Sequence, residues 1–172
     1  MKDNLVIQTM LDHKSIRKYT DETPSEEVIK TIIRASQQAP FASQLYSILL
    51  SRNRKRNPWK APLLFTICVD VHKFERIMTK RNWQIATNDL TLLMFGIQDA
   101  ALMAQNMVVA GRSLGLGSCW IGFAKVLDRD DYARKLLGIP YSYELAAPII
   151  FGYPLETKKT PERKVKILKW VD

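Results

Sequence analysis

The segment from Ile97 to Leu114 constrains the fold of this chain most, because apart from Gly111 and three polar pairs every position in it is apolar. Its polar residues form pairs that recur every seven residues: Gln98 with Asp99, Gln105 with Asn106, and Arg112 with Ser113. Since seven residues make about two helical turns, this spacing predicts a helix that is buried nearly all round and carries one narrow polar seam. At a rise of about 1.5 Å per residue, such a helix would be roughly 27 Å long, the width of a small domain.

A helix of this kind needs apolar cover on most of its surface. A chain of 172 residues has few other elements to provide that cover, so the pattern favours a homodimer. We expect a second copy to cover one particular apolar face, because a patch of that size is rarely exposed on a monomer. The face consists of Ala100, Met103, Ala104, Met107 and Val108.

Local patterns predict the other elements. Helices are expected at residues 1–12, from an N-cap at Ser25 to Ala39, at His72–Arg81, and at Asp128–Leu137 with Gly138 as its C-cap. Strands are expected at Ser47–Ser51, Leu63–Val71, Leu116–Phe123 and Leu145–Phe151. Strands and helices do not alternate strictly, and the chain has no linker or repeat. We therefore predict one domain over residues 1–172 with an α+β fold, in which helices sandwich a sheet.

The charge of the chain indicates a phosphate-bearing partner. Lys and Arg number 26 against 17 Asp and Glu, which gives a net charge of +9. Such a surplus suits both nucleic acids and phosphorylated cofactors. The basic stretch from Arg52 to Lys60 includes Trp59, and this combination keeps a module that binds single-stranded nucleic acid as one alternative.

Several other classes of protein are disfavoured. The N-terminus turns polar before an apolar stretch long enough for a signal peptide has formed. The polar residues within the long apolar segment argue against a membrane span. Cys68 and Cys119 lie in apolar runs without CxxC spacing, which indicates buried thiols in a reducing compartment, so we expect a cytoplasmic protein. A metal site is not indicated, because His13, His72 and the cysteines are far apart in the sequence.

The stretch from His13 to Arg17 brings basic side chains and a hydroxyl together within five residues. Arg17 offers a planar fork of N–H donors suited to a phosphate, and Ser15 adds a neutral donor. The residues alone leave two interpretations open, an anion-binding site and a solvated run of charge at a helix end.

These residues also open a series of six blocks, in order, that resembles the nitroreductase family from about residue 10 to the end of the chain. The blocks are His13-Lys-Ser-Ile-Arg-Lys-Tyr-Thr-Asp21, Ile33-Arg-Ala-Ser-Gln-Gln-Ala-Pro-Phe-Ala-Ser-Gln44, Gln98-Asp-Ala-Ala-Leu-Met-Ala-Gln-Asn-Met107, Ser113-Leu-Gly-Leu-Gly-Ser-Cys-Trp-Ile-Gly122, Leu136-Leu-Gly-Ile-Pro140 and Phe151-Gly-Tyr-Pro154. Two positions depart from the family pattern. His13 stands where the family usually has arginine, and Gln44-Leu-Tyr-Ser47 replaces an Asn-x-Gln-Pro-Trp stretch.

The resemblance implies a mostly antiparallel sheet and a homodimer with FMN bound at the subunit interface. The residues that match the family's ligands for the FMN phosphate and ribityl chain are His13, Lys14, Ser15 and Arg17, joined near the C-terminus by Arg163 and Lys164.

The resemblance also implies contacts to the flavin ring. Asn57 and Lys60 match an Asn-x-x-Lys pair that lies against the ring, where a cation stabilises the charge of the reduced flavin. The contact from the partner subunit would come from Pro40 to Ser43, including Phe41, and the other side of the ring would be lined by Trp120, Ile121 and Gly122.

The activity that follows is ping-pong transfer of hydride from NADH or NADPH, through FMN, to a small oxidised acceptor such as a nitroaromatic, quinone, free flavin or enone. The flavin performs this reaction while the protein sets orientation, potential and access, so no side chain is expected to be catalytic. The alternatives are a flavin-storage or flavin-consuming protein of the same fold, and the basic nucleic-acid-binding module.

Overall fold

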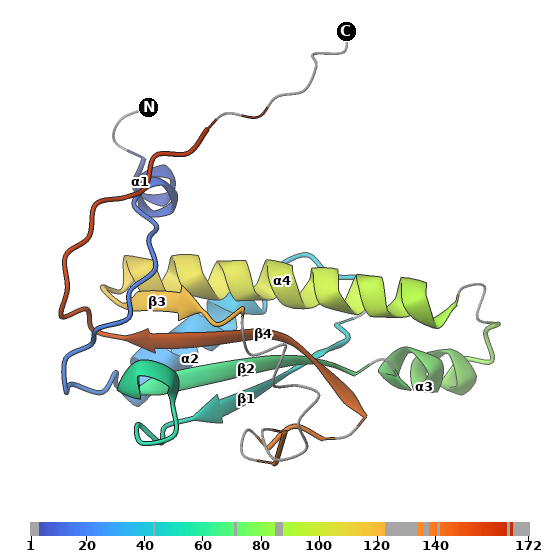
Figure 1. Cartoon of the computed structure of the whole chain (residues 1–172). Coiled ribbons are helices and arrows are strands. Elements are labelled where there is room, and N and C mark those ends of the chain that lie inside the picture. The colour runs from blue at the N-terminus through green and yellow to red at the C-terminus, as the bar shows by residue number, and fades with distance from the viewer. Residues whose placement is uncertain are drawn as a thin grey trace, which may run out of the picture.

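The structure is a computed structural model that describes residues 4–42, 44–70, 72–84, 88–122, 134–135, 138–140, 142–164 and 166. Its helices are α1 (Leu5–Leu11), α2 (Glu26–Ser36), α3 (His72–Lys80) and α4 (Asp89–Ser113), with a short 3-10 helix η1 (Pro58–Lys60) (Figure 1). Its strands are β1 (Tyr46–Ser51), β2 (Leu63–Asp70), β3 (Gly117–Trp120) and β4 (Tyr143–Gly152). The predicted elements within these residues are therefore confirmed, with shifted ends.

The four strands form one sheet in the order β1-β2-β4-β3, and every neighbouring pair is antiparallel. β2 is central and all of its residues are buried, as its unbroken apolar sequence predicts. The α+β fold with an antiparallel sheet is therefore confirmed.

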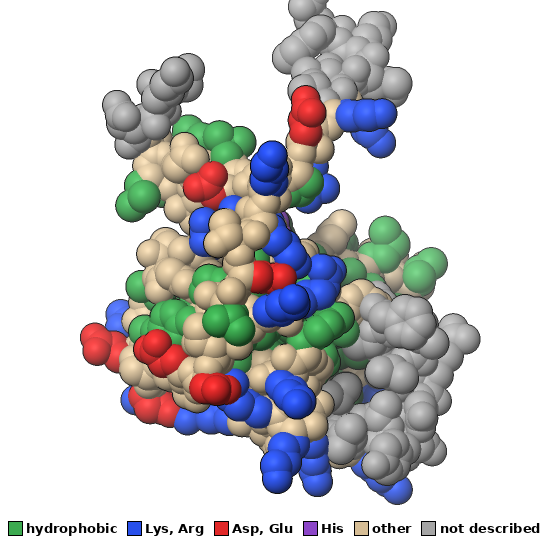
Figure 2. Space-filling model, turned by 60° about the vertical axis from the view of Figure 1, so that its left-hand side comes forward, with side chains coloured by type: hydrophobic (Ala, Val, Ile, Leu, Met, Phe, Trp, Pro, Cys, Tyr) green, Lys and Arg blue, Asp and Glu red, His purple; other side chains and the backbone are tan. Residues whose placement is uncertain are grey.

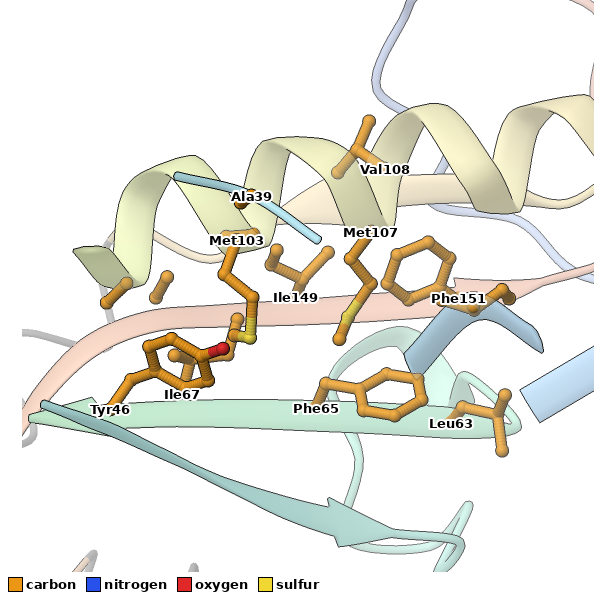
Figure 3. Packing of buried hydrophobic residues seen from close by; sticks show 14 of the residues in the cluster. Ala39, Tyr46, Leu63, Phe65, Ile67, Met103, Met107, Val108, Ile149 and Phe151 are labelled. Carbon is orange, nitrogen blue, oxygen red and sulfur yellow. The ribbon is translucent and has the colours of Figure 1, made fainter. Parts of the chain in front are cut away.

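One face of the sheet is covered by α4, and α2 packs beside α4 (Figure 1). Met103 and Met107 point from α4 toward the sheet, and Met107 lies between Phe65 of β2 and Phe151 of β4 (Figure 3). The two phenylalanine rings pack edge to face with their centroids 5.6 Å apart. Gly111 permits this close approach, because a Cβ there would lie 2.6 Å from Cε1 of Phe151.

The structure corrects the prediction about which face of this helix needs a partner. The predicted face, Ala100, Met103, Ala104, Met107 and Val108, is at most 1% exposed in the single chain. The sheet and α2 are sufficient to cover that stripe. The helix also begins at Asp89, well before the predicted start at Ile97, after an N-cap at Asn88. Its opposite face leaves Met94, Phe95 and Leu102 53%, 40% and 45% exposed, so the helix is not buried all round.

The second face of the sheet carries smaller apolar clusters. Cys119 packs there with Leu64 and Ile150, and Cys68 packs with Ile139 and Leu145. Both cysteines are buried thiols, as predicted. The predicted helix Asp128–Leu137 lies outside the described residues except for Arg134 and Lys135, which are helical.

The backbone at Gly138 has the geometry of the predicted cap. Gly138 has φ of +70°, and the N–H groups of Gly138 and Ile139 donate to the carbonyls of Lys135 and Arg134. Both observations are typical of a glycine C-cap.

The segments near the two ends of the chain project outward beyond the sheet, and α1 touches the body of the molecule at α4 (Figure 1). In α1 only Thr9 is buried, while five apolar side chains are exposed: Leu5, Val6, Ile7, Met10 and Leu11. α4 is long and apolar enough to cross a membrane by length and composition alone. Its packing against the sheet accounts for that composition, because the core helix of a globular protein has the same character.

Candidate functional site

The residues that follow α1 run alongside the end of β3. Ser15 forms a parallel bridge with Ser118, and the N–H of Ile16 donates to the carbonyl of Ser118 at 2.9 Å. Gly117 makes this approach possible, because a Cβ there would lie 2.8 Å from the Cβ of Ile16. The basic stretch His13–Arg17 is therefore fixed against the sheet, which argues against a solvated run of charge.

A second segment, after β4, holds the basic stretch from its other side. The carboxylate of Glu156 accepts hydrogen bonds from the N–H groups of Arg17 at 2.8 Å and Lys18 at 3.2 Å. The pKa of Glu156 is lowered by its surroundings, most strongly by the hydrogen bond from Arg17 and next by the contact with Lys158. Lys158 also donates to the carbonyl of Ser15 at 3.2 Å. The sequence does not reveal Glu156 or Lys158 as part of the site, because only the tertiary structure brings residues 156–158 beside residues 15–18.

Two arginines lie near His13. The pKa of His13 is lowered by burial, then by the positive charges of Arg163 and Arg112. Lys and Arg side chains gather where α1 and the C-terminal segment leave the body of the molecule (Figure 2). The sequence placed Arg163 here but assigned Arg112 only to the polar seam of a helix. Lys14 is half-buried and Lys164 is exposed.

A groove of about 390 Å³ begins at the other end of the basic stretch. Its lining includes the predicted residues Arg17 and Lys60, together with Trp59 and Arg54. The guanidinium carbon of Arg17 lies 5.6 Å from the centroid of the Trp59 ring, within the range of a cation–π contact. The structure therefore brings Arg17 and Lys60 to one groove.

The loop that carries Trp59 and Lys60 is attached by hydrogen bonds to the segment that follows the basic stretch. Arg54 donates from Nη2 to the carbonyls of Thr20, Asp21 and Glu22. Trp59 and Lys60 have φ of +50° and +53°, a left-handed conformation that non-glycine residues rarely adopt. Such a conformation persists only where the surrounding contacts impose it, and it clusters at functional sites.

Asn57 is part of this support. Its side-chain amide is buried and donates to the carbonyls of Ser51 and Ala61, at 3.2 and 3.0 Å. Its side-chain oxygen accepts from the Ser51 hydroxyl at 2.8 Å. In the predicted Asn57 and Lys60 pair, Lys60 lines the groove, and the buried side chain of Asn57 stabilises the loop through its hydrogen bonds.

The remaining predicted ring contacts lie at two other places. Trp120 ends β3 and is partly exposed, Ile121 is half-buried, and Gly122 is exposed with open space where a Cβ would point.

Pro40 and Phe41 are exposed in the turn after α2, and Ser43 lies outside the described residues. Asp99 of α4 fixes this turn, since its carboxylate accepts from the N–H of Ala42 at 2.7 Å and of Leu45 at 3.4 Å. Within the described part of one chain, no hydrogen bond or ion pair joins this turn to residues 13–17.

The donor set fits a molecule with a phosphate at one end and carbonyl groups at the other. Basic side chains surround His13, while Arg17 and Lys60 line the groove. The extended chain between residues 13 and 17 covers roughly 13 Å, at about 3.3 Å per residue. Among the residues that the structure describes, no three His, Cys, Asp or Glu side chains gather as a metal site would need.

Comparisons with known proteins show which family the chain resembles. Residues 49–153 match the model of the nitroreductase family. The chain is 31% identical to an FMN reductase (NADPH) of Bacillus subtilis over 79% of its own length and 64% of that enzyme's length. It is 29% identical to a putative NADH dehydrogenase/NAD(P)H nitroreductase of Methanothermobacter thermautotrophicus over 96% of this chain and 87% of the other.

A solved structure shows the same arrangement of helices and strands. The NADPH:FMN oxidoreductase from Vibrio harveyi complexed with NAD+ superposes with a TM-score of 0.81 at 25% identity, over 98% of this chain and 79% of that one. The family model covers Asn57, Lys60 and Trp120–Gly122, and the relatives extend the similarity to the basic stretch before it. The chain belongs to the nitroreductase family.

Proposed function

We propose that this protein is an FMN-dependent oxidoreductase that transfers hydride from NADH or NADPH to a small oxidised acceptor. The observation that carries the proposal is one short stretch of chain with basic side chains gathered around His13 and a groove at Arg17. FMN has the matching shape, with a phosphate at one end and ring carbonyls at the other. Relatives named FMN reductase and NADPH-flavin oxidoreductase support the same chemistry.

The phosphate end of FMN would lie among His13, Lys14, Ser15, Arg163 and Lys164. Charge-assisted hydrogen bonds from these groups are stronger than neutral ones, so they would supply much of the binding energy. Glu156 helps indirectly, because it holds the backbone of Arg17 and Lys18 while its ion pair with Lys158 limits the repulsion it exerts on a phosphate.

The ring end would lie between the groove and the end of β3. There Arg17 and Lys60 would face the pyrimidine edge of the flavin, where reduction places negative charge. Trp120, Ile121 and Gly122 would form a wall beside the ring, and open space at Gly122 leaves room for it. Bound FMN supplies the capacity to accept hydride from the nicotinamide and to pass it to the acceptor.

A second copy of the chain would complete the site. The exposed apolar side chains of α1 and the outward face of α4, including Met94, Phe95 and Leu102, form a surface that an isolated monomer rarely tolerates. If α1 and α4 pack against a partner, the turn at Pro40–Ser43 can reach the flavin bound mainly by the other subunit. The dimer would be cytoplasmic, with buried thiols at Cys68 and Cys119.

An anaerobic titration of the purified protein tests this function. The protein should carry FMN, NADH or NADPH should bleach its absorbance, and an added quinone or nitroaromatic should restore it. Bound FMN that neither nucleotide bleaches would indicate flavin storage or consumption instead. A colourless protein with salt-dependent affinity for single-stranded DNA would contradict both flavin functions and support the nucleic-acid-binding module.

A further inference from the structure

Arg112 lies in the last turn of α4 and is half-buried. Its guanidinium forms no ion pair or hydrogen bond with any residue that the structure describes. A cation at the C-terminus of a helix is favourable to the helix dipole, and that alone would explain a basic residue at this position. The helix dipole does not explain why Arg112 lies close to two other basic residues, His13 and Arg163.

The chain path brings Arg112 beside His13. The parallel bridge between Ser15 and Ser118 holds the segment that follows His13 beside the segment that follows Arg112. His13 comes just before one strand of this bridge, and the turn after Arg112 leads into the other. Ile16 packs against Gly117 at the same point, so the two segments cannot separate without breaking this contact. α1, which precedes His13, also contacts α4.

Electrostatics agrees with this placement, because the pKa of His13 is lowered by burial, then by the positive charges of Arg163 and Arg112. Like charges held close together raise the free energy of the folded chain unless an anion lies between them. Glu156, the carboxylate that lies against the basic stretch, already has other partners. Glu156 accepts from the N–H groups of Arg17 and Lys18 and pairs with Lys158.

We propose that Arg112 is a direct ligand of the FMN phosphate, in a cluster with His13 and Arg163. The inference rests on the proposed function, which supplies FMN as the phosphate monoester. The planar guanidinium presents parallel N–H donors that match two phosphate oxygens, which an ammonium group does not. Arg112 thereby adds a charge to a site where His13 stands in place of the family's usual arginine.

Comparison of FMN with riboflavin tests this assignment, because riboflavin lacks only the phosphate. Arg112→Ala should weaken FMN binding about tenfold or more, the effect expected of a charge-assisted contact, and leave riboflavin binding within about twofold of wild type. Arg112→Lys should fall between wild type and Arg112→Ala for FMN. The matched control is Arg34→Ala, because Arg34 is also a basic residue in the last turn of a helix, α2, and is exposed. It should change neither affinity.

The possible outcomes distinguish a failure of the Arg112 assignment from a failure of the proposed function. Equal loss of FMN and riboflavin affinity in Arg112→Ala would overturn the inference and assign Arg112 to the fold, as would unchanged FMN affinity. A wild-type protein that binds neither flavin would instead refute the proposed function. If Arg112→Ala does not fold, Arg112→Lys decides the question, because loss of preference for FMN over riboflavin supports a phosphate contact and unchanged preference contradicts it.

Discussion

Gly117 and Ile16 are in such close contact that a Cβ on Gly117 would lie 2.8 Å from both Cβ and Cγ1 of Ile16. Ile16 is the apolar residue in the middle of the basic stretch, and its side chain is buried. A core contact thus positions the polar residues on either side of Ile16. Their placement is set by packing before any ligand binds.

Gly117→Ala should therefore weaken flavin binding through the position of residues 13–17. The added methyl group must displace Ile16, and overpacking of this kind costs about 1–3 kcal/mol of stability. Chemical denaturation and FMN titration measure the two effects. Ser118→Ala, a change of the next residue in β3, should alter both much less. Wild-type affinity for FMN in a destabilised Gly117→Ala protein would show that this packing does not control the site.

Asp99→Asn should loosen the turn that follows α2. The carboxylate accepts N–H bonds from Ala42 and Leu45, and an amide would turn one accepting oxygen into a donor that faces another N–H. Loss of a buried hydrogen bond of this kind costs about 1–3 kcal/mol. Urea denaturation checks this, with Asp89→Asn, an exposed carboxylate on the same helix, as the control. Equal stability of the two variants would contradict the proposed role of Asp99.

Lys60→Met should lower the midpoint potential of bound FMN. If Lys60 faces the pyrimidine edge, removal of its charge makes the negative charge of the reduced flavin more costly. The potential follows from equilibration with a reference dye. Lys55→Met removes a charge from the same loop at a position outside the groove lining and should have a smaller effect. Equal shifts in both variants would place Lys60 outside the flavin site.

The protein without flavin should lose stability as the pH falls below about 6.5, the usual pKa of histidine. The folded-state pKa of His13 is lowered by burial and by Arg163 and Arg112, so the unfolded chain takes up a proton first. Acidification through this window therefore favours unfolding, down to the lowered pKa. Bound FMN should reduce the effect, because a phosphate favours the charged imidazole.

Thermal denaturation at pH values on either side of this window measures the change. His13→Gln should show a smaller drop in midpoint temperature between the two pH values than wild type does. An identical drop in both proteins would assign the pH dependence to other groups.

The sequence predicts best those features that depend on neighbouring residues. The N-cap at Ser25, which accepts from the N–H of Val28, and the buried strand β2 follow from local chemistry and from a run of apolar residues. The glycine cap at Gly138 is of the same kind.

Features that depend on contacts between distant residues were harder to predict. The apolar composition of α4 does not reveal which stripe meets the sheet, so the sequence points to the wrong face as the one that needs a partner. Arg112 fits a polar seam in the sequence, and only the bridge between Ser15 and Ser118 brings its segment beside that of His13. Asn57 matches a flavin-contact motif, yet its amide is used by Ser51 and Ala61, which no motif reveals.

Sedimentation velocity, followed both in protein absorbance and in the visible absorbance of the flavin, tests the central claim that two copies of the chain complete each FMN site. Both signals should sediment together as a dimer, and dilution to nanomolar concentration should release FMN as the dimer dissociates. Phe95→Lys on the exposed face of α4 should cause the same loss at higher protein concentration. A folded monomer that still carries FMN at nanomolar concentration would contradict the claim.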